Sequence, residues 1–519
     1  MTSQAEDAQA TATVHERLAE VLAGARLGGS EKSRQKILES GKLLVRDRLR
    51  LFFDDEDYVE DGLLARYSEG LPGDAVVCAY GFVDGRKVCV IANDYSVKAG
   101  TWGSRTFEKI TFAQETAVAA GIPIVYLFDS AGARIDEQFE SFAGRHAWGN
   151  IFYNQVQISG RVPQVCALFG PSPAGSAYVP ALCDMTIMVR GNATAYLGSP
   201  RLAEMVTGEK VTLEEMGGAE MHSTISGLSD VLVEDDLEAL NAIRVWLSFL
   251  PPNWEKPAPI AAAAAPRPGR ALSEIVPLRE AEVFDMEEFI ESLVDEGSYF
   301  PYKELFAPEL ITGFARIDGR PVGLVANQPS HMGGSLFTNS SDKAARFIWI
   351  CNAYNVPIIF LVDIAGFMIG SAVEREGIIR HGAKMIFAVS ECRVPRITVL
   401  VRKAYGGGYL AMSGAPMHPD AVIALPTARP ALMGSDAAVN GVYYNQIQAI
   451  EDPEERAAFV KAKQAEYAEG IDVFKIADAN AVEAVVPSDE LRSDLSRRLD
   501  LYSRRPKTPV VRRQAVTPV

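Results

Sequence analysis

Three consecutive glycines, Gly406 to Gly408, follow a β-branched run at 397–401 whose apolar residues predict a buried strand. After the glycines the pattern becomes helical, from Leu410 onward. A helix that begins directly after a strand leaves its first backbone N–H groups without acceptors, and the helix dipole favours negative charge there. Glycine lets an external atom approach those groups closely. The stretch therefore has the chemistry of an anion-stabilising turn, or it is only a tight turn.

The chain contains this arrangement twice. Residues 121–135 (GIPIVYLFDSAGARI) align with residues 355–369 (NVPIIFLVDIAGFMI), so that Asp129 matches Asp363, 363 minus 129 or 234 positions later. Two further blocks match in the same order, and they place Ala174-Gly175-Ser176 where the second copy has its three glycines. Three ordered blocks indicate a duplicated domain. Two like turns indicate two anion-stabilising pockets; the alternative is that small residues only allow the next helix to pack closely.

Strands alternate with helices in both copies, and this alternation predicts an α/β class. Proline and alanine without periodicity at 251–270 indicate a linker between the copies. We therefore expect an N-terminal domain at 1–250, a linker at 251–275 and a C-terminal domain at 276–519.

The composition excludes several classes of function. The 519 residues include 51 basic and 67 acidic side chains, for a net charge of −16, which argues against nucleic-acid binding. None of the six cysteines forms a C-x-x-C pair, so a zinc ribbon and a thioredoxin motif are excluded and a reducing compartment fits. The N-terminus lacks the apolar core of a signal peptide, and no run is long enough to span a membrane. We expect a soluble, cytoplasmic protein without membrane contact.

An ordered set of motifs is more specific. The set consists of DSAGARI at 129–135, GPSPAGSAYVPAL at 170–182, TGEKVTLEEMGGAEMH at 207–222, DIAGFMIG at 363–370, EGIIRHGAKMI at 376–386 and VPRITVLVRKAYGGGY at 394–409. It resembles the carboxyltransferase β subunit of biotin-dependent acyl-CoA carboxylases, the propionyl-CoA and methylcrotonyl-CoA carboxylase group. The resemblance covers residues 15–505, with a first half closer to the methylcrotonyl type and a second half closer to the propionyl type.

The resemblance implies an α/β fold of two tandem crotonase-like domains, each a spiral of ββα units. It implies that the N-terminal domain binds acyl-CoA and the C-terminal domain binds carboxybiotin, with the active site between the N-domain of one subunit and the C-domain of another. A homohexamer core is expected, partnered by an α subunit that carries biotin and has biotin carboxylase activity. This chain has no Walker-A pattern, so ATP and bicarbonate are expected on that partner. Ala383-Lys384-Met385 is similar to a biotin attachment sequence but lies in a helical pattern, so biotin is not expected on this chain.

The chemistry implied by the resemblance needs backbone donors. When carboxybiotin gives up its carboxyl group, negative charge is left on the ureido oxygen; the biotin nitrogen takes the α-proton of the thioester, which becomes an enolate. Two anions need two oxyanion holes. By resemblance, Ala174 and Gly175 serve the acyl-CoA enolate, and Gly407 and Gly408 serve the biotin ureido oxygen. The family usually has two glycines at the first pair; Ala174 keeps the N–H group but adds a methyl group.

Further site residues are implied by resemblance. The substrate-binding set is Ala131, Gly132, Ala133, Arg134, Tyr178 and Leu410, and the biotin-binding set is Ala365, Gly366, Phe367, Tyr405 and Gly406. Many propionyl-specific members carry aspartate at the position of Leu410, so we hypothesise an acyl pocket that takes branched or longer chains; the alternative is a leucine that only packs.

No metal site is expected. The mechanism needs no side-chain base, so a structural role is expected for the candidate histidines, which are His146, His222, His331 and His381. Asp129 and Asp363 end equivalent strands and are expected to fix a turn. Two other functions stay open: the transferase subunit of a biotin-dependent decarboxylase, and a non-catalytic scaffold for the biotin subunit.

Overall fold

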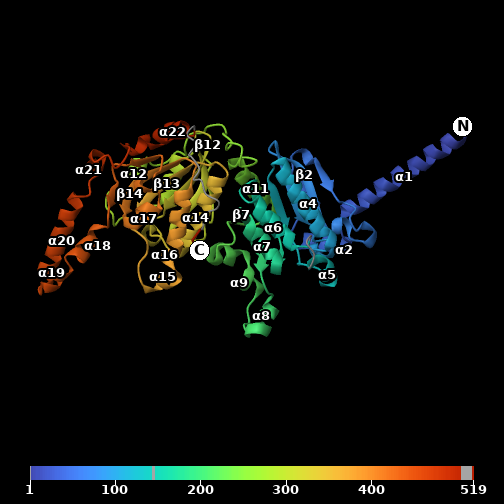
Figure 1. The fold of residues 1–519 in the computed structure, drawn as a ribbon, viewed down its shortest axis with the longest axis horizontal. Coiled ribbons are helices and arrows are strands. Elements are labelled where there is room, and N and C mark those ends of the chain that lie inside the picture. Colours follow the sequence, from blue (N-terminus) through green and yellow to red (C-terminus); the bar gives the residue numbers. More distant parts are fainter. Residues whose placement is uncertain (1, 143–146, 504–516, 519) are drawn as a thin grey trace. The chain divides into compact units, whose positions relative to one another are not determined.

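The structure, a computed structural model, describes residues 2–142, 147–503 and 517–518. The chain forms two compact units (Figure 1): unit 1 comprises Met1–Ser248 and Pro252–Lys256, and unit 2 comprises Phe249–Pro251 and Pro257–Val519. The sequence-predicted linker at 251–275 carries one short helix, α12 (Leu272–Ile275), and its role as a domain boundary stays a prediction. Every helix in the described ranges is too short or too polar to cross a membrane.

Unit 1 is built on a seven-stranded sheet in the order β1-β2-β3-β4-β5-β7-β9. The first three strands pair antiparallel and the others parallel. A small parallel pair, β6 with β8, lies outside this sheet. The strands are β1 (Tyr58–Asp61), β2 (Val76–Val83), β3 (Arg86–Asn93), β4 (Ile124–Phe128), β5 (Gln164–Leu168), β6 (Pro171–Pro173), β7 (Met185–Val189), β8 (Thr194–Tyr196) and β9 (Val231–Val233).

Helices connect the strands of unit 1, and α4 packs against α6. The α-helices are α1 (Thr2–Leu27), α2 (Glu31–Glu39), α3 (Val45–Phe52), α4 (Ser104–Ala120), α5 (Gln138–Phe142), α6 (Gly149–Ile158), α7 (Tyr178–Leu182), α8 (Pro200–Thr207), α9 (Leu213–Gly217), α10 (Ala219–Met221) and α11 (Asp236–Phe249).

Unit 2 repeats the plan of unit 1 in the order β10-β11-β12-β13-β14-β15-β17, with β16 paired to the end of β14. The strands are β10 (Phe300–Pro301), β11 (Leu310–Ile317), β12 (Arg320–Asn327), β13 (Ile358–Ile364), β14 (Arg396–Tyr405), β15 (Ala421–Ala424), β16 (Arg429–Ala431) and β17 (Ala484–Val485). The remaining α-helices are α13 (Met286–Leu293), α14 (Thr338–Ala353), α15 (Ser371–Glu376), α16 (Ile378–Glu391), α17 (Gly406–Ala411), α18 (Ser435–Val442), α19 (Tyr444–Ala449), α20 (Pro453–Glu469), α21 (Val473–Asp478) and α22 (Leu491–Tyr502).

Matching turns show how the duplicated sequence produces the duplicated fold. Asp84 and Gly85 link β2 to β3 with φ of 50° and 73°, and Asp318 and Gly319 link β11 to β12 with φ of 50° and 77°. Two consecutive positive φ angles make the tight hairpin turn that suits the twist of antiparallel strands, and Asp-Gly is a favoured sequence for it. The Asp-Gly turn thus pairs β2 with β3 in unit 1 as it pairs β11 with β12 in unit 2.

The central parallel strands are buried along their length. All residues of β4, β5, β7 and β13 are buried, because helices cover both faces of a parallel sheet. Asp129 directly follows β4, and Asp363 is the penultimate residue of β13. The segments that follow these two acids therefore start at the carboxyl edge of each sheet, where open α/β sheets commonly bind ligands.

Candidate functional site

The first predicted turn lies in unit 1, after β6. Ala174 begins a 3₁₀ turn, Ala174–Ala177, in the left-handed region with φ of 54°, and its side chain is exposed. Gly175 follows, and a β-carbon added there would lie 2.1 Å from Cζ3 of Trp148. The indole ring thus occupies the space of a side chain at 175, so only glycine keeps both the turn and the ring in place.

The loop after β4 lies against this turn. Its backbone exchanges hydrogen bonds with the segment before α4: Ala131 N–H donates to Ala99 O (3.0 Å), and Trp102 N–H donates to Gly132 O (2.9 Å). A β-carbon on Gly132 would lie 3.2 Å from Cγ of Pro173, the residue just before Ala174. Ala131 and Ala133 are exposed while Gly132 is buried. The structure therefore brings the predicted residues Ala131 to Ala133 beside Ala174.

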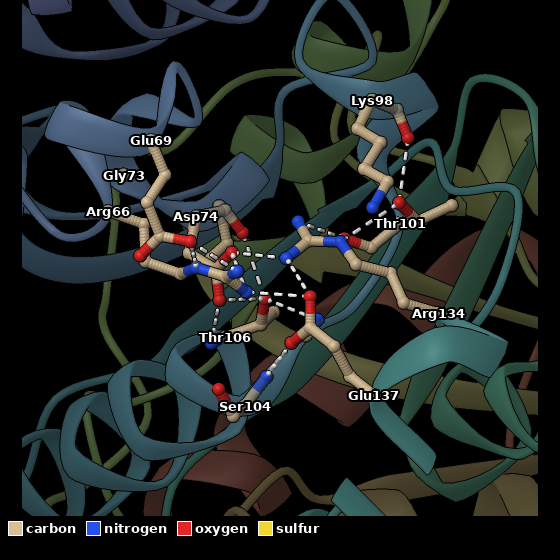
Figure 2. A network of polar contacts seen from close by, with 12 residues as sticks. Arg66, Glu69, Gly73, Asp74, Lys98, Thr101, Ser104, Thr106, Arg134 and Glu137 are labelled. Atoms are coloured by element: carbon tan, nitrogen blue, oxygen red, sulfur yellow. Dashed lines mark hydrogen bonds and ion pairs between the residues drawn. The ribbon is translucent and has the colours of Figure 1, made fainter. Parts of the chain in front are cut away.

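Arg134 lies in the same loop but points into the protein (Figure 2). Its side chain is 1% exposed and forms an ion pair with Asp74, which is fully buried. The same guanidinium donates to Thr101 O at 2.9 Å and lies 3.3 Å from Glu137. These partners occupy its donors, so the structure gives Arg134 the role of holding the loop and leaves no free guanidinium for a ligand.

Arg66 extends this network from another segment. Its guanidinium lies 2.6 Å from Glu137 and 3.7 Å from Asp74. Burial opposes ionisation of Glu137, but the hydrogen bonds donated by Arg66 and by Ser104 N–H outweigh burial and lower the pKa of Glu137 from 4.5 to about 2. Three separate stretches of unit 1, which contain Asp74, Ser104 and Glu137, are thereby joined in one network (Figure 2).

Aromatic rings flank the first turn. Phe152 meets Trp148 edge-on with ring centroids 5.3 Å apart, and Tyr178 meets Phe152 edge-on at 6.2 Å. The side chain of Tyr178 remains 49% exposed. The predicted residue Tyr178 therefore presents an accessible ring close to the turn, as a group that lines an apolar acyl pocket does.

The second predicted turn, in unit 2, is the start of α17. Gly406 has φ of 52°, and a β-carbon there would lie 2.9 Å from Leu432 O. Gly408 is buried: its β-carbon would lie 2.9 Å from Cα of Gly366 and 2.7 Å from Cδ1 of Ile364. Gly407 is exposed, and the nearest neighbour of its β-carbon would be Cδ2 of Phe367 at 3.9 Å. The glycines thus form a cradle beside Gly366 and Phe367 that side chains would fill.

The loop after β13 matches the loop after β4. Leu336 N–H donates to Gly366 O (3.1 Å), and Met368 N–H donates to Leu336 O (2.9 Å), as the segment around Trp102 does in unit 1. Ala365 is exposed, like its counterpart Ala131. The structure therefore assembles the predicted biotin-side residues Ala365, Gly366 and Phe367 with the second turn.

Tyr405 and Leu410 flank the second turn. The side chain of Tyr405 is 3% exposed, and burial together with the nearby Glu280 carboxylate raises the pKa of Tyr405 above its usual range. This phenol stays protonated at neutral pH. Leu410 is half-buried on α17 and leaves part of its side chain accessible.

Buried ion pairs lie at the carboxyl ends of both central strands. Asp363 bonds Arg402 at 2.8 Å, and both side chains are 0% exposed. Lys403 N–H also donates to Asp363 at 2.8 Å. Asp129 bonds Lys42 at 2.8 Å instead. The sequence indicated that the two aspartates fix turns but did not identify Lys42 and Arg402, because a lysine far upstream and an arginine within a strand carry no local signal.

The histidines make local contacts. His222 is half-buried and bonds Ser226 Oγ (2.6 Å) and Ala195 O (2.7 Å), and burial lowers the pKa of His222 below 6.5. His381 bonds Asp342 at 2.8 Å, and His331 lies 3.3 Å from Ser330 Oγ. His146 lies outside the described residues. Within the described ranges no cluster of His, Cys, Asp and Glu is suited to hold a metal ion.

Both turns can therefore present main-chain N–H groups to an anion. The first amides of α17, including those of Gly407 and Gly408, have no acceptor inside the helix, because a helix supplies none to its first turn. At Gly407 the space that a side chain would fill is open, whereas at Gly175 it is filled by the ring of Trp148. Such donors can stabilise an oxygen that becomes negative during a reaction.

Comparisons with known proteins show the family of the chain. A family model described as "Carboxyl transferase domain" matches residues 36–516. The chain is 53% identical to an uncharacterized carboxylase of Bacillus subtilis (strain 168), over 95% of this chain and 97% of that protein. It is 39% identical to the methylmalonyl-CoA decarboxylase subunit alpha of Veillonella parvula (92% and 93%) and 37% identical to the human mitochondrial propionyl-CoA carboxylase beta chain (95% and 92%).

A solved structure shares the fold. Transcarboxylase 12S, described as a hexamer assembly with methylmalonyl-coenzyme A and methylmalonic acid bound, matches with a TM-score of 0.91 and 37% identity, over 97% of this chain and 98% of that chain. The predicted α/β fold with two tandem crotonase-like domains is confirmed by this match.

Proposed function

This chain belongs to the carboxyl transferase family and is a biotin-dependent acyl-CoA carboxyltransferase, and we propose that its two glycine turns carry the reaction. Carboxyl transfer is to the α-carbon, or the vinylogous γ-carbon, of an acyl-CoA. Bound carboxybiotin, carried by a partner subunit, supplies the carboxyl group and a nitrogen that accepts the substrate proton. The observation that supports the proposal is the pair of matching turns, each with small residues and each beside the loop that follows a central strand.

In unit 1, we assign the amides of Ala174 and Gly175 to the thioester oxygen. This oxygen becomes an enolate oxyanion when the α-proton leaves, and amides that already point at it stabilise the transition state more than the ground state. Ala131 to Ala133 and Tyr178 line the acyl-CoA side. Arg134 positions their loop from the buried network around Asp74.

In unit 2, we assign the amides of Gly407 and Gly408 to the ureido oxygen of biotin. The residues present fit a flat bicyclic group, because Gly407 is open and its nearest neighbour for an added carbon is the ring of Phe367. Ala365, Gly366 and Gly406 form the same cradle. Tyr405, directly before Gly406, contributes a buried, protonated phenol.

The partner and the assembly are part of the proposal. We assign ATP and bicarbonate to a biotin carboxylase subunit that also carries biotin. We further propose a homohexamer core in which the acyl-CoA side of one subunit meets the biotin side of another, supported by the hexamer described for transcarboxylase 12S. A cytoplasmic location accords with six cysteines that are all buried and outside any disulfide bond.

The direction of transfer in the cell has a specific alternative. The relative from Veillonella parvula is a decarboxylase subunit, and decarboxylation runs the same half-reaction backwards. Incubation of the purified chain with methylmalonyl-CoA or malonyl-CoA and free biotin, without ATP, tests the shared half-reaction. We expect loss of the carboxyl group from the CoA ester only when biotin is present.

Adding a soluble biotin subunit with ATP, bicarbonate and a panel of acyl-CoA esters then tests the direction. Net carboxylation of an acyl-CoA supports the carboxylase, and net release of CO₂ coupled to a membrane partner supports the decarboxylase. A chain that binds the biotin subunit but transfers no carboxyl group in either assay is a scaffold, and that outcome contradicts the proposal.

A further inference from the structure

The duplicated domains neutralise their buried aspartates differently. In unit 2, Arg402 donates two hydrogen bonds to the carboxylate of Asp363, from Nη2 at 2.8 Å and from Nε at 3.2 Å. Arg402 lies on β14, the strand next to β13, so unit 2 supplies its own cation.

In unit 1, the position that matches Arg402 is Gly170, directly after β5 and Phe169. A β-carbon on Gly170 would lie 1.9 Å from Oδ1 of Asp129 and 3.1 Å from Nζ of Lys42. The ammonium of Lys42 bonds both carboxylate oxygens of Asp129, at 2.8 and 3.0 Å. The two side chains are 9% and 1% exposed. Asp129 and Lys42 together therefore occupy the space that a side chain at position 170 would need.

Lys42 belongs to the N-terminal segment between α2 and α3, upstream of the repeated blocks. Its ammonium lies 4.4 Å from the ring centroid of Tyr95, a cation–π contact. The next residue, Leu43, donates its N–H to Asp236 at 2.9 Å, and Arg48 bonds the same carboxylate at 2.8 Å. The segment is thus fixed to the domain directly after Lys42.

The ion pair between Lys42 and Asp129 lies at the start of the two chain segments that form the predicted acyl-CoA side. Asp129 precedes the loop with Ala131 to Ala133, and Gly170 precedes the stretch that ends in Ala174 and Gly175. Between them, Ser130 N–H donates to Pro171 O at 3.0 Å. A displacement of Asp129 would therefore move both loops of the acyl-CoA side together.

We propose that Lys42 is a positioning residue of the acyl-CoA side, supplied by an element outside the repeated domain in place of the strand arginine of unit 2. This inference rests on the proposed function of the two turns. Lys42 has two effects: it holds Asp129 at the junction of the loops, and it cancels a buried negative charge close to the place where an enolate forms. Without Lys42, the nearest cation to Asp129 is Arg48, whose Nη2 lies 3.7 Å from Oδ2 and outside hydrogen-bond distance. A carboxylate compensated so weakly opposes a second negative charge nearby.

The test compares Lys42→Met with its twin in the other unit, Arg402→Met, in the full-length chain. Lys32→Met, an exposed lysine on α2, controls for the loss of one positive charge from the same segment. Carboxyl transfer from methylmalonyl-CoA to free biotin gives separate values of kcat/KM for the CoA ester and of KM for biotin. We expect Lys42→Met to lower kcat/KM for the CoA ester about 10²-fold and to change KM for biotin less than about twofold.

Arg402→Met should do the reverse: KM for biotin rises, and KM for the CoA ester stays near its original value. Lys42→Gln retains an N–H donor without the charge; it should fold if Lys42→Met does not, with a smaller loss in the same direction. If the Lys42 variants impair the use of the CoA ester and of biotin to the same extent, the positioning role is overturned. A fall in Tm in the same variants would then show that Lys42 only stabilises the fold.

Amide hydrogen exchange gives a readout that does not depend on activity. Lys42→Met should speed exchange in 130–134 and 171–175 and leave 364–368 and 404–408 unchanged, and Arg402→Met should give the opposite pattern. Unchanged exchange in 130–134 contradicts the inference. If the unmodified chain transfers no carboxyl group at all, the proposed function fails, and the exchange pattern still decides whether Lys42 positions these loops.

Discussion

At Gly407 the side chain is a hydrogen atom. Among the described residues, apart from its chain neighbours and the backbone of its own helix, the one heavy atom within 4 Å of an added β-carbon is Cδ2 of Phe367 at 3.9 Å. This space allows an experiment that separates the backbone donor from the shape of the turn. Proline and alanine both add a β-carbon, but only proline removes the N–H group. Gly407 is the second residue of α17, where the helix itself does not use this N–H.

We expect Gly407→Pro to lower kcat for carboxyl transfer about 10²- to 10³-fold relative to Gly407→Ala, because one oxyanion donor contributes about 2.7–4 kcal/mol. The measurement is carboxyl transfer from methylmalonyl-CoA to biotin, with circular dichroism and Tm to establish that both variants are folded. Equal rates for the two variants would show that the Gly407 amide takes no part in the reaction.

Substitution of the single residue Leu410 tests which acyl-CoA esters the site prefers. It is half-buried on α17, so an aspartate there places a charge on an apolar wall. We expect Leu410→Asp to lower kcat/KM for butyryl-CoA and longer esters about tenfold or more relative to propionyl-CoA, and Leu410→Met, of similar volume, to keep the original order. Assays across acetyl to longer CoA esters give the comparison. Identical profiles in all three proteins would mean that Leu410 only packs.

Single residues were predictable from sequence where local pattern carries the signal. The three glycines after a strand predicted the turn in unit 2, and the internal repeat predicted the matching turn in unit 1. Arg134 shows what local pattern leaves out: its motif indicated a substrate contact, which stays a prediction, and gave no sign that the side chain is 1% exposed and paired with Asp74. Lys42 and Arg402 could not be predicted for the same reason, since tertiary pairing of charges has no local sequence signature.

At the scale of elements, long apolar runs were predicted well and mixed ones were not. The apolar part of the repeated block at 121–135 forms β4. The strand predicted at 397–401 is longer in the structure, because β14 continues through Arg402 and Lys403 to Tyr405. Two basic residues end the apolar pattern, yet Arg402 is buried against Asp363 and its strand continues beside β16. An ion pair thus replaces hydrophobicity as the stabilising interaction in that stretch.

Glu137 allows the network of Figure 2 to be tested through pH. Its pKa is lowered to about 2 in the folded protein, so its contribution to stability is fully present above pH 4.5 and is lost as the pH falls from 4.5 toward 2. With allowance for solvent screening, we expect Glu137→Gln to lower the free energy of unfolding by about 2 kcal/mol at pH 7.

Urea denaturation at several pH values between 7 and 3 measures the effect of Glu137→Gln. The difference between the variant and the original protein should shrink as the pH falls below 4.5, because the unfolded state of the original protein then binds a proton at Glu137 while its folded state stays ionised. Glu69→Gln removes a more exposed partner of Arg66, 55% exposed, and should have the smaller effect. A constant difference across this pH range would show that the Glu137 charge does not stabilise the loop.

At the scale of the whole molecule, the duplication was readable from sequence because the blocks keep their order and spacing. How the duplicated units assemble into an oligomer could not be read from local sequence pattern, because residues on the two sides of a subunit interface share no such pattern. The proposed site needs one turn from unit 1 and one from unit 2. Whether the two come from one chain or from two neighbouring chains decides whether a single subunit can act alone.

Mixing two inactive variants resolves this question. Gly175→Ala disables the acyl-CoA side by displacing Trp148, and Gly407→Pro disables the biotin side. If each site combines unit 1 of one chain with unit 2 of a neighbour, a mixed pair contains one site with two defects and one site with none. Statistical mixing then makes half of the pairs mixed and restores about one quarter of the original activity, as expected for symmetric assemblies.

The subunits must exchange for this result to appear, so the two variants are co-expressed with different affinity tags and purified through both. Doubly tagged original protein gives the reference rate, and each variant alone gives the background. Restoration well above background requires sites shared between chains. Activity that stays at background while the doubly tagged oligomer is recovered intact means that each chain builds its own site, and the proposed arrangement of neighbouring subunits is then wrong.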